Sequence, residues 1–171
     1  RFWVEEFGID GLRLDVAYML DGSFMRELAE ACRGIKSDFF LVGEMIHGDY
    51  NRLLGTLDSV TNYECYKGLY SAFNSMNMFE IGHSLTRQFG SDPWCLYRGK
   101  HLSSFVDNHD VTRIASILVR KEHLEPLYGL LFGMPGIPFV YYGSEWGAEG
   151  RKENGDDALR PSFDAPVKNT L

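Results

Sequence analysis

Gly11-Leu12-Arg13-Leu14-Asp15 is the stretch that indicates the fold, because a short apolar run ends there on charged side chains. Phe40-Leu41-Val42-Gly43-Glu44 and Phe105-Val106-Asp107-Asn108-His109-Asp110 follow the same plan. Each stretch is typical of a buried strand with acidic side chains at its carboxyl end. Enzymes built on parallel α/β barrels keep their active sites at the carboxyl ends of the strands. The three stretches therefore predict an α/β fold with an acidic site along one edge of the sheet.

Strand-like and helix-like segments alternate along the chain, which predicts parallel strands joined by helices. Strands are expected at 11–15, 39–43, 57–61, 102–107 and 137–142, and helices at 1–7, 24–32, 64–73, 81–89 and 124–132. From Gly143 onward, glycine, proline and charged residues predict a long loop. About five βα units fall short of the ~250 residues of an eight-stranded barrel. Residues 1–171 are therefore expected to form a single domain, either a small open sheet or part of a larger barrel.

Composition narrows the choice of partners and compartment. With 17 Lys+Arg against 24 Asp+Glu, the net charge of −7 disfavours nucleic acids and anionic membrane surfaces as partners. The longest apolar region, 124–143, is interrupted by prolines and falls short of the ~20 apolar residues of a membrane span. Cys32, Cys65 and Cys95 are odd in number and form no Cys-x-x-Cys pair. Free thiols, and with them a reducing compartment such as the cytoplasm, are favoured over a disulfide framework or a zinc site.

Two carboxylates stand at the ends of the first two strong strands. Arg13 and Asp15 are two residues apart on a predicted strand, so their side chains project from one face. The guanidinium favours the ionised carboxylate that a nucleophile needs, and a buried structural ion pair is the alternative. Glu44 ends the next strand, and neighbouring strands lie ~4.8 Å apart, close to the ~5–5.5 Å between the carboxyl groups of a retaining glycosidase. The apolar run before Glu44 favours a desolvated general acid; a helix-capping or solvated glutamate is the alternative.

Asn108, His109 and Asp110 follow the strand at 102–107 and offer groups that grip sugar hydroxyls and stabilise positive charge on a sugar ring. Capping of the next helix is the alternative for this tripeptide. Asp107 and Asp110 are both candidate acids, and spacing does not choose between them.

Aromatic rings near the predicted strand ends offer flat surfaces for sugar stacking: Tyr63, Tyr66, Tyr142 and Trp146. Core packing is the expected role of most of them, and Trp146, in a polar loop, is the favoured sugar contact. A metal site is the rival chemistry, with His47, Asp49, His109 and Asp110 as its ligands. No His-x-His or His-Glu-x-x-His spacing supports it.

Taken together, these motifs resemble the α-amylase family of glycoside hydrolases. Gly11-Leu12-Arg13-Leu14-Asp15-Val16-Ala17 is similar to the second signature block of the family, Val42-Gly43-Glu44 to the third and Phe105-Val106-Asp107-Asn108-His109-Asp110 to the fourth. The stretches 134–138 and 141–145 (Met-Pro-Gly-Ile-Pro and Tyr-Tyr-Gly-Ser-Glu) resemble the eighth strand and its following loop. The resemblance covers essentially the whole chain.

The resemblance implies a role for each candidate residue. Asp15 is expected as the nucleophile, Glu44 as the acid/base and Asp110 as the transition-state stabiliser, with Arg13 holding the nucleophile and His109 binding the sugar. Asn108, Tyr63 and Trp146 complete the expected substrate-binding set. The implied substrates are α-glucans or maltooligosaccharides, cleaved with retention. The chemistry is expected to use no metal and no cofactor, although many members carry a structural calcium.

Two departures from the family pattern shape the expectation. The first signature block, on strand 3, is absent, which predicts a partial (β/α)8 TIM barrel of about five parallel strands, from about strand 4 to strand 8, without strands 1–3 and the last helix. The usual calcium ligands are then mostly absent as well. We expect the 171-residue chain alone to be inactive or nearly so, and its open barrel edges favour self-association.

Tyr18 and Met19 replace the Lys-His or Asn-Glu that family members place there, on the leaving-group side of the cleaved bond. The substrate within the α-glucan class, the linkage, and the choice between hydrolysis and transfer therefore stay open. A non-catalytic, amylase-like glucan-binding domain and a metal-dependent TIM-barrel hydrolase are the alternatives to the glycosidase.

Overall fold

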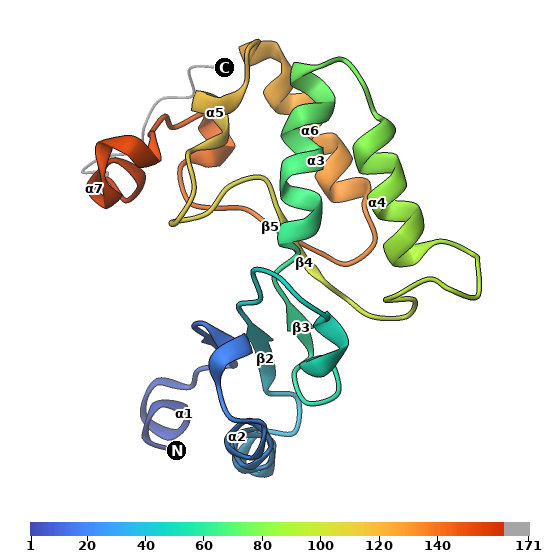
Figure 1. Ribbon diagram of the computed structural model, residues 1–171. Coiled ribbons are helices and arrows are strands. Elements are labelled where there is room, and N and C mark those ends of the chain that lie inside the picture. The colour runs from blue at the N-terminus through green and yellow to red at the C-terminus, as the bar shows by residue number, and fades with distance from the viewer. Residues whose placement is uncertain (163–171) are drawn as a thin grey trace.

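The computed structural model describes residues 1–162 of the chain. Figure 1 shows short strands at the centre and helices around them. In chain order the elements are α1 (Phe2–Phe7), β1 (Gly11–Leu14), α2 (Gly22–Ile35), β2 (Phe40–Gly43), β3 (Ser59–Val60), α3 (Tyr63–Asn74), α4 (Phe79–Phe89), β4 (Ser103–Phe105), α5 (Ile114–Ile117), α6 (Leu124–Gly133), β5 (Ile137–Phe139) and α7 (Asp156–Leu159). Helices and strands alternate as predicted, and the helix expected at 81–89 is α4, which follows α3 within the connection from β3 to β4. The short helix α5 was not expected.

All the strand pairings are parallel. β1, β2 and β3 form one sheet in chain order, with Leu14 opposite Gly43 and Gly43 opposite Val60. β4 and β5 form a second, two-stranded sheet. A single parallel bridge between Thr61 and Ser103 joins β3 to β4. The five strands therefore follow one another in chain order with their carboxyl ends on the same side, as in a section of a barrel wall.

Local sequence explains where the helices begin and end. α1 ends at Gly8, whose φ of 61° is a left-handed conformation that glycine adopts without steric penalty. α2 begins after Asp21, whose carboxylate accepts the backbone N–H groups of Ser23 and Phe24. Of its apolar positions, Met25 and Cys32 are buried, whereas the ring of Phe24 is exposed.

The region after Gly143 differs from the predicted loop. It contains 3-10 turns at Ser144–Trp146 and Lys152–Asn154 and the short helix α7. Gly143, Gly147 and Gly155 all have positive φ and delimit these turns. The glycines that suggested a loop thus separate single helical turns, which are too short to produce a recognisable periodicity in the sequence.

Buried apolar side chains form two clusters. The first packs around β1–β3 and α2 and includes Leu41, Leu57 and Val60. The second lies beneath α3, α4 and α6 and includes Leu69 and Leu127. Figure 1 shows the same division, with α1 and α2 beside the first sheet and α3, α4 and α6 grouped on the other part of the molecule.

Across residues 1–162, no helix combines the length and the apolar character that crossing a membrane requires.

Candidate active site

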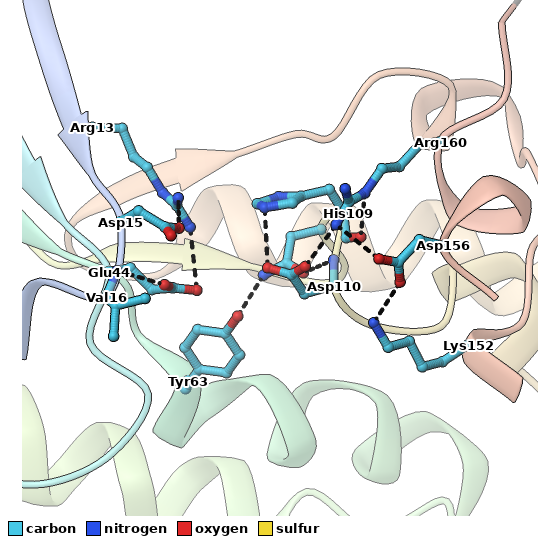
Figure 2. A network of polar contacts seen from close by, with 11 residues as sticks. Arg13, Asp15, Val16, Glu44, Tyr63, His109, Asp110, Lys152, Asp156 and Arg160 are labelled. Carbon is cyan, nitrogen blue, oxygen red and sulfur yellow. Dashed lines mark hydrogen bonds and ion pairs between the residues drawn. The ribbon is translucent and has the colours of Figure 1, made fainter.

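The acidic residues predicted from the strand ends come together at one edge of the sheet. Asp15 and Glu44 directly follow β1 and β2, which are paired neighbours. His109 and Asp110 lie in the loop after β4. Figure 2 shows Asp15 and Glu44 beside Arg13, and His109 and Asp110 in a second group next to them.

Arg13 connects the two predicted catalytic carboxylates. Its Nη1 donates to Asp15 Oδ1, and its Nη2 lies 3.2 Å from Glu44 Oε1. The environments of the two acids differ sharply, since the Asp15 side chain is 71% exposed and that of Glu44 only 5%. Asp15 is therefore not part of a buried structural pair, and Glu44 is not a solvated or helix-capping glutamate. One carboxylate is accessible and the other is enclosed, a difference in environment that suits two different roles.

Val16 brings a backbone N–H to the enclosed carboxylate. Its amide nitrogen donates to Glu44 Oε2 at 3.0 Å. Val16 has φ 47° and ψ 41°, a left-handed conformation that is an outlier for a β-branched residue. Such strain is retained where the surrounding structure requires it, and it clusters at functional sites. Here it accompanies the hydrogen bond from Val16 to Glu44.

Asn108 shapes the loop that carries Asp110. Its Nδ2 donates to Tyr63 Oη at 2.9 Å, and its Oδ1 accepts the backbone N–H of Asp110 at 2.8 Å. Both the nitrogen and the oxygen of the amide are thus engaged within the protein. His109 Nε2 lies 3.0 Å from Asp110 Oδ2. The predicted sugar contacts Asn108 and Tyr63 therefore hold the loop in place, while His109 and Asp110 are its partly exposed groups.

Arg160 is a site residue that the sequence did not point to. Its Nη2 lies 3.0 Å from Asp110 Oδ1, and its Nε donates to the carbonyl oxygen of His109 at 3.2 Å. Asp156 and Lys152 continue the ion-pair network away from the site (Figure 2). Arg160 lies in the predicted loop, 50 residues beyond Asp110. A single arginine in such a loop forms no motif whose spacing would indicate a functional role.

The structure separates Asp107 from Asp110. Asp107 is 1% exposed, and its carboxylate accepts the Ser144 hydroxyl and, at 2.8 Å, the backbone N–H of Ile114. Burial raises the pKa of Asp107, opposed by those hydrogen bonds. Asp107 is thus a buried structural acid. Asp110, with a side chain 36% exposed, is the more accessible of the two acids.

A cavity of about 250 Å³ lies between the strand ends. Its polar lining comes from Arg13, Glu44, Thr61, Asp107, Asn108, His109 and Tyr141, whereas Asp15 and Asp110 lie outside it. Trp146, the predicted sugar contact, is half-buried in the turn Ser144–Trp146 and is not part of this lining. Tyr66 stacks on Phe105 in the interior, as expected of a packing residue.

The ligands proposed for a metal site do not assemble. Within residues 1–162, no group of three or more His, Cys, Asp or Glu side chains is arranged to hold a metal ion. The His47 ring instead lies 5.3 Å from that of Tyr18, and Asp49 caps a 3-10 turn through the backbone N–H of Asn51.

The fold and the site define a class: a section of a parallel α/β barrel with a cavity and a group of acidic side chains at the carboxyl ends of its strands. The model of the alpha-amylase catalytic domain matches residues 1–167, and the chain belongs to this family. The predicted family and the predicted partial barrel are both confirmed.

Several curated relatives and solved structures are similar to this chain. It is 31% identical over 159 residues to a maltogenic alpha-amylase from Bacillus acidopullulyticus and 34% identical over 166 residues to neopullulanase 2 from Thermoactinomyces vulgaris. These alignments cover 91% and 94% of the chain, which spans only 27% of the length of each relative. The structure matches an alpha-amylase from Geobacillus thermoleovorans, complexed with acarbose, with a TM-score of 0.80 at 26% identity, over 95% of this chain and 38% of that one.

Proposed function

We propose that the polypeptide containing this chain cleaves or transfers α-glucosidic bonds by a retaining double displacement. The observation that carries the proposal is the arginine-linked pair of carboxylates, with Asp15 open to solvent and Glu44 enclosed at the end of the neighbouring strand. A retaining glycosidase needs an accessible nucleophile beside a proton donor. The names of the relatives, which include maltogenic amylase, cyclomaltodextrinase and neopullulanase, support maltooligosaccharides or related α-glucans as the substrate class.

In the first displacement, an Asp15 oxygen attacks the anomeric carbon and the bond from that carbon to the leaving oxygen breaks. Glu44 gives its proton to the leaving oxygen, and the sugar is left esterified to Asp15. Arg13 donates to Asp15 and holds its carboxylate in place before the attack. The positive charge that develops on the ring is stabilised by Asp110, and His109 binds the sugar beside it.

In the second displacement, the Glu44 carboxylate takes a proton from water or from an acceptor sugar hydroxyl. The activated oxygen attacks the anomeric carbon, the ester bond to Asp15 breaks, and both carboxyl groups return to their starting states. Two inversions at one carbon give net retention. These steps use side chains alone. A structural calcium in the complete polypeptide remains a prediction.

The test is turnover of an aryl α-maltoside by the natural full-length polypeptide, compared with its Asp15→Asn variant. We expect Asp15→Asn to lower kcat by several orders of magnitude, because the covalent route is lost. Asp10→Asn is the matched control. Asp10 precedes β1, at the opposite end from Asp15, and its exposed side chain pairs only with Lys36 among the described residues. A mild loss in Asp15→Asn would exclude Asp15 as the nucleophile. A polypeptide that binds maltodextrin without turnover would indicate the glucan-binding domain instead.

A further inference from the structure

We propose that Arg113 is a positioning residue for this site, acting through Arg160 on Asp110. The inference rests on the proposed role of Asp110. Arg113 touches neither the cavity nor the predicted catalytic acids, and its side chain is completely buried. Arg113 instead binds the end of α7, the residue that directly precedes Arg160.

The guanidinium of Arg113 is bound from several sides. Nε donates to the carbonyl oxygen of Leu159 at 3.1 Å. Nη1 donates to the carbonyl oxygen of Tyr142 at 2.6 Å and to Ser144 Oγ at 3.1 Å. The Tyr141 ring lies 4.0 Å from the guanidinium carbon. Three hydrogen bonds and a ring face on one planar group fix its position far more closely than charge alone would.

Burying a cation requires a compensating charge, and Asp107 supplies it. The Ser144 hydroxyl accepts from Arg113 and donates to the Asp107 carboxylate, so it links the two charges. The Arg113 backbone N–H also donates to the carbonyl oxygen of Gly150 at 2.8 Å. Side chain and backbone of Arg113 therefore tie the loop after β4 to the chain between 142 and 159. Burying such charged groups costs desolvation free energy, and we infer that the network is retained because it fixes the position of the chain around it.

The geometry it specifies is that of Arg160. Leu159 is the last residue of α7, and the terminal carbonyl groups of a helix lack partners within the helix. Arg113 Nε binds the last of these carbonyls, one peptide unit before Arg160. Arg160 in turn contacts Asp110 Oδ1 and the carbonyl oxygen of His109. A shift of α7 would therefore move the group that orients Asp110.

A double-mutant cycle in the natural full-length polypeptide tests this coupling. The variants are Arg113→Lys, which keeps the charge but loses the planar fork, Arg160→Ala, and the two combined, with aryl α-maltoside as substrate. We expect each single change to lower kcat/KM tenfold or more, mainly through kcat, and the combined variant to be little worse than either. Losses that multiply, or an unaffected kcat in Arg113→Lys, would overturn the proposal, because independent sites contribute additively in free energy.

Ser144→Ala covers the case in which Arg113→Lys does not fold. It removes one partner of Arg113 while leaving the arginine and its bond to Leu159. We expect the same non-additive pattern with Arg160→Ala, at smaller size. Additive losses would again contradict the proposal.

Backbone hydrogen exchange separates this inference from the proposed function, because it needs no turnover. In Arg113→Lys we expect faster exchange at 156–160 and unchanged exchange in α2, which belongs to the other apolar cluster. Unchanged exchange at 156–160 would refute the positioning role even in an active enzyme. Faster exchange there, in a polypeptide without any glycosidase activity, would support the role of Arg113 in fixing α7 and defeat only the proposed function.

Discussion

Val16 combines a strained backbone with a contact to the candidate acid/base. A left-handed conformation at a non-glycine residue costs ~1–3 kcal/mol, and glycine adopts it freely. We expect Val16→Gly to raise the free energy of unfolding by about 1 kcal/mol, after the loss of some chain entropy. Urea denaturation measures this change. Val119→Gly is the control, because Val119 is exposed and has ordinary φ, and it is expected to lose stability slightly. A destabilised Val16→Gly would show that the backbone there is not strained.

Asp107 gives the protein a characteristic pH dependence. Burial raises its pKa above the reference value of 3.8, so the folded state holds this proton more tightly than the unfolded state. The linked stabilisation is complete below pH 3.8 and is lost as the pH rises through the raised pKa. Asp107→Asn cannot titrate. The free energy of unfolding of the wild type minus that of Asp107→Asn should therefore fall as the pH increases from about 4. Urea midpoints across pH measure it, and a constant or rising difference would contradict the assignment.

At the scale of elements, an amide pair joins α3, α4 and β4. Asn62, which precedes α3, exchanges hydrogen bonds of 2.9 and 3.0 Å with Gln88 of α4, and its Nδ2 reaches Ser104 Oγ of β4. Asn62 and Gln88 are completely buried. An unpaired buried amide is destabilising, so these bonds fix how the helices sit against the strand.

Asn62→Leu should therefore lower the free energy of unfolding by about 1–3 kcal/mol, because Gln88 is left unsatisfied. The combined variant Asn62→Leu/Gln88→Met should lose less than the sum of the two single changes, since it leaves neither amide of the pair unpaired. Chemical denaturation of the full-length polypeptide measures all three variants. Strictly additive losses would mean that the two amides act separately.

Predicting these elements from sequence succeeded where a signal was long and failed where it was short. The apolar run before Glu44 and the glycine after α1 indicated a strand and a helix end that the structure contains. The strand expected at 137–142 ends at Phe139, because only three residues find a partner on β4. Strand length depends on pairing between distant segments, which one sequence does not reveal.

The residues of the candidate site likewise fall into those that the sequence indicated and those that it could not. The strand ends indicated Asp15, Glu44 and an acid after the strand at 102–107, because parallel strands bring their carboxyl ends together. Only the family resemblance pointed to Asp110. Spacing could not choose between Asp107 and Asp110, because that choice depends on burial. Arg160 was missed for a related reason: its contact with Asp110 joins residues 50 positions apart and follows no periodicity.

On the scale of the whole molecule, the 171-residue chain leaves β1 and β5 paired on one side only among the described strands. Phe2, Trp3 and Phe7 of α1 are each at least 60% exposed and contact one another. Unpaired strand edges and exposed aromatic rings promote association. We expect this chain, expressed alone, to sediment as a mixture of species heavier than 19.5 kDa and to show no turnover of aryl α-maltoside. A monodisperse monomer, or measurable turnover, would contradict this prediction.

The bridge between Thr61 and Ser103 is the junction of the two sheets, and the proposed catalytic residues come from both sides of it. Asp15 and Glu44 follow strands of one sheet, and His109 and Asp110 follow a strand of the other. Cutting the complete polypeptide between β3 and β4 would leave the attacking and proton-donating groups on one piece and the charge-stabilising group on the other. The two pieces would then behave as a split reporter, silent when apart and producing sugar only when fused partners dock them together.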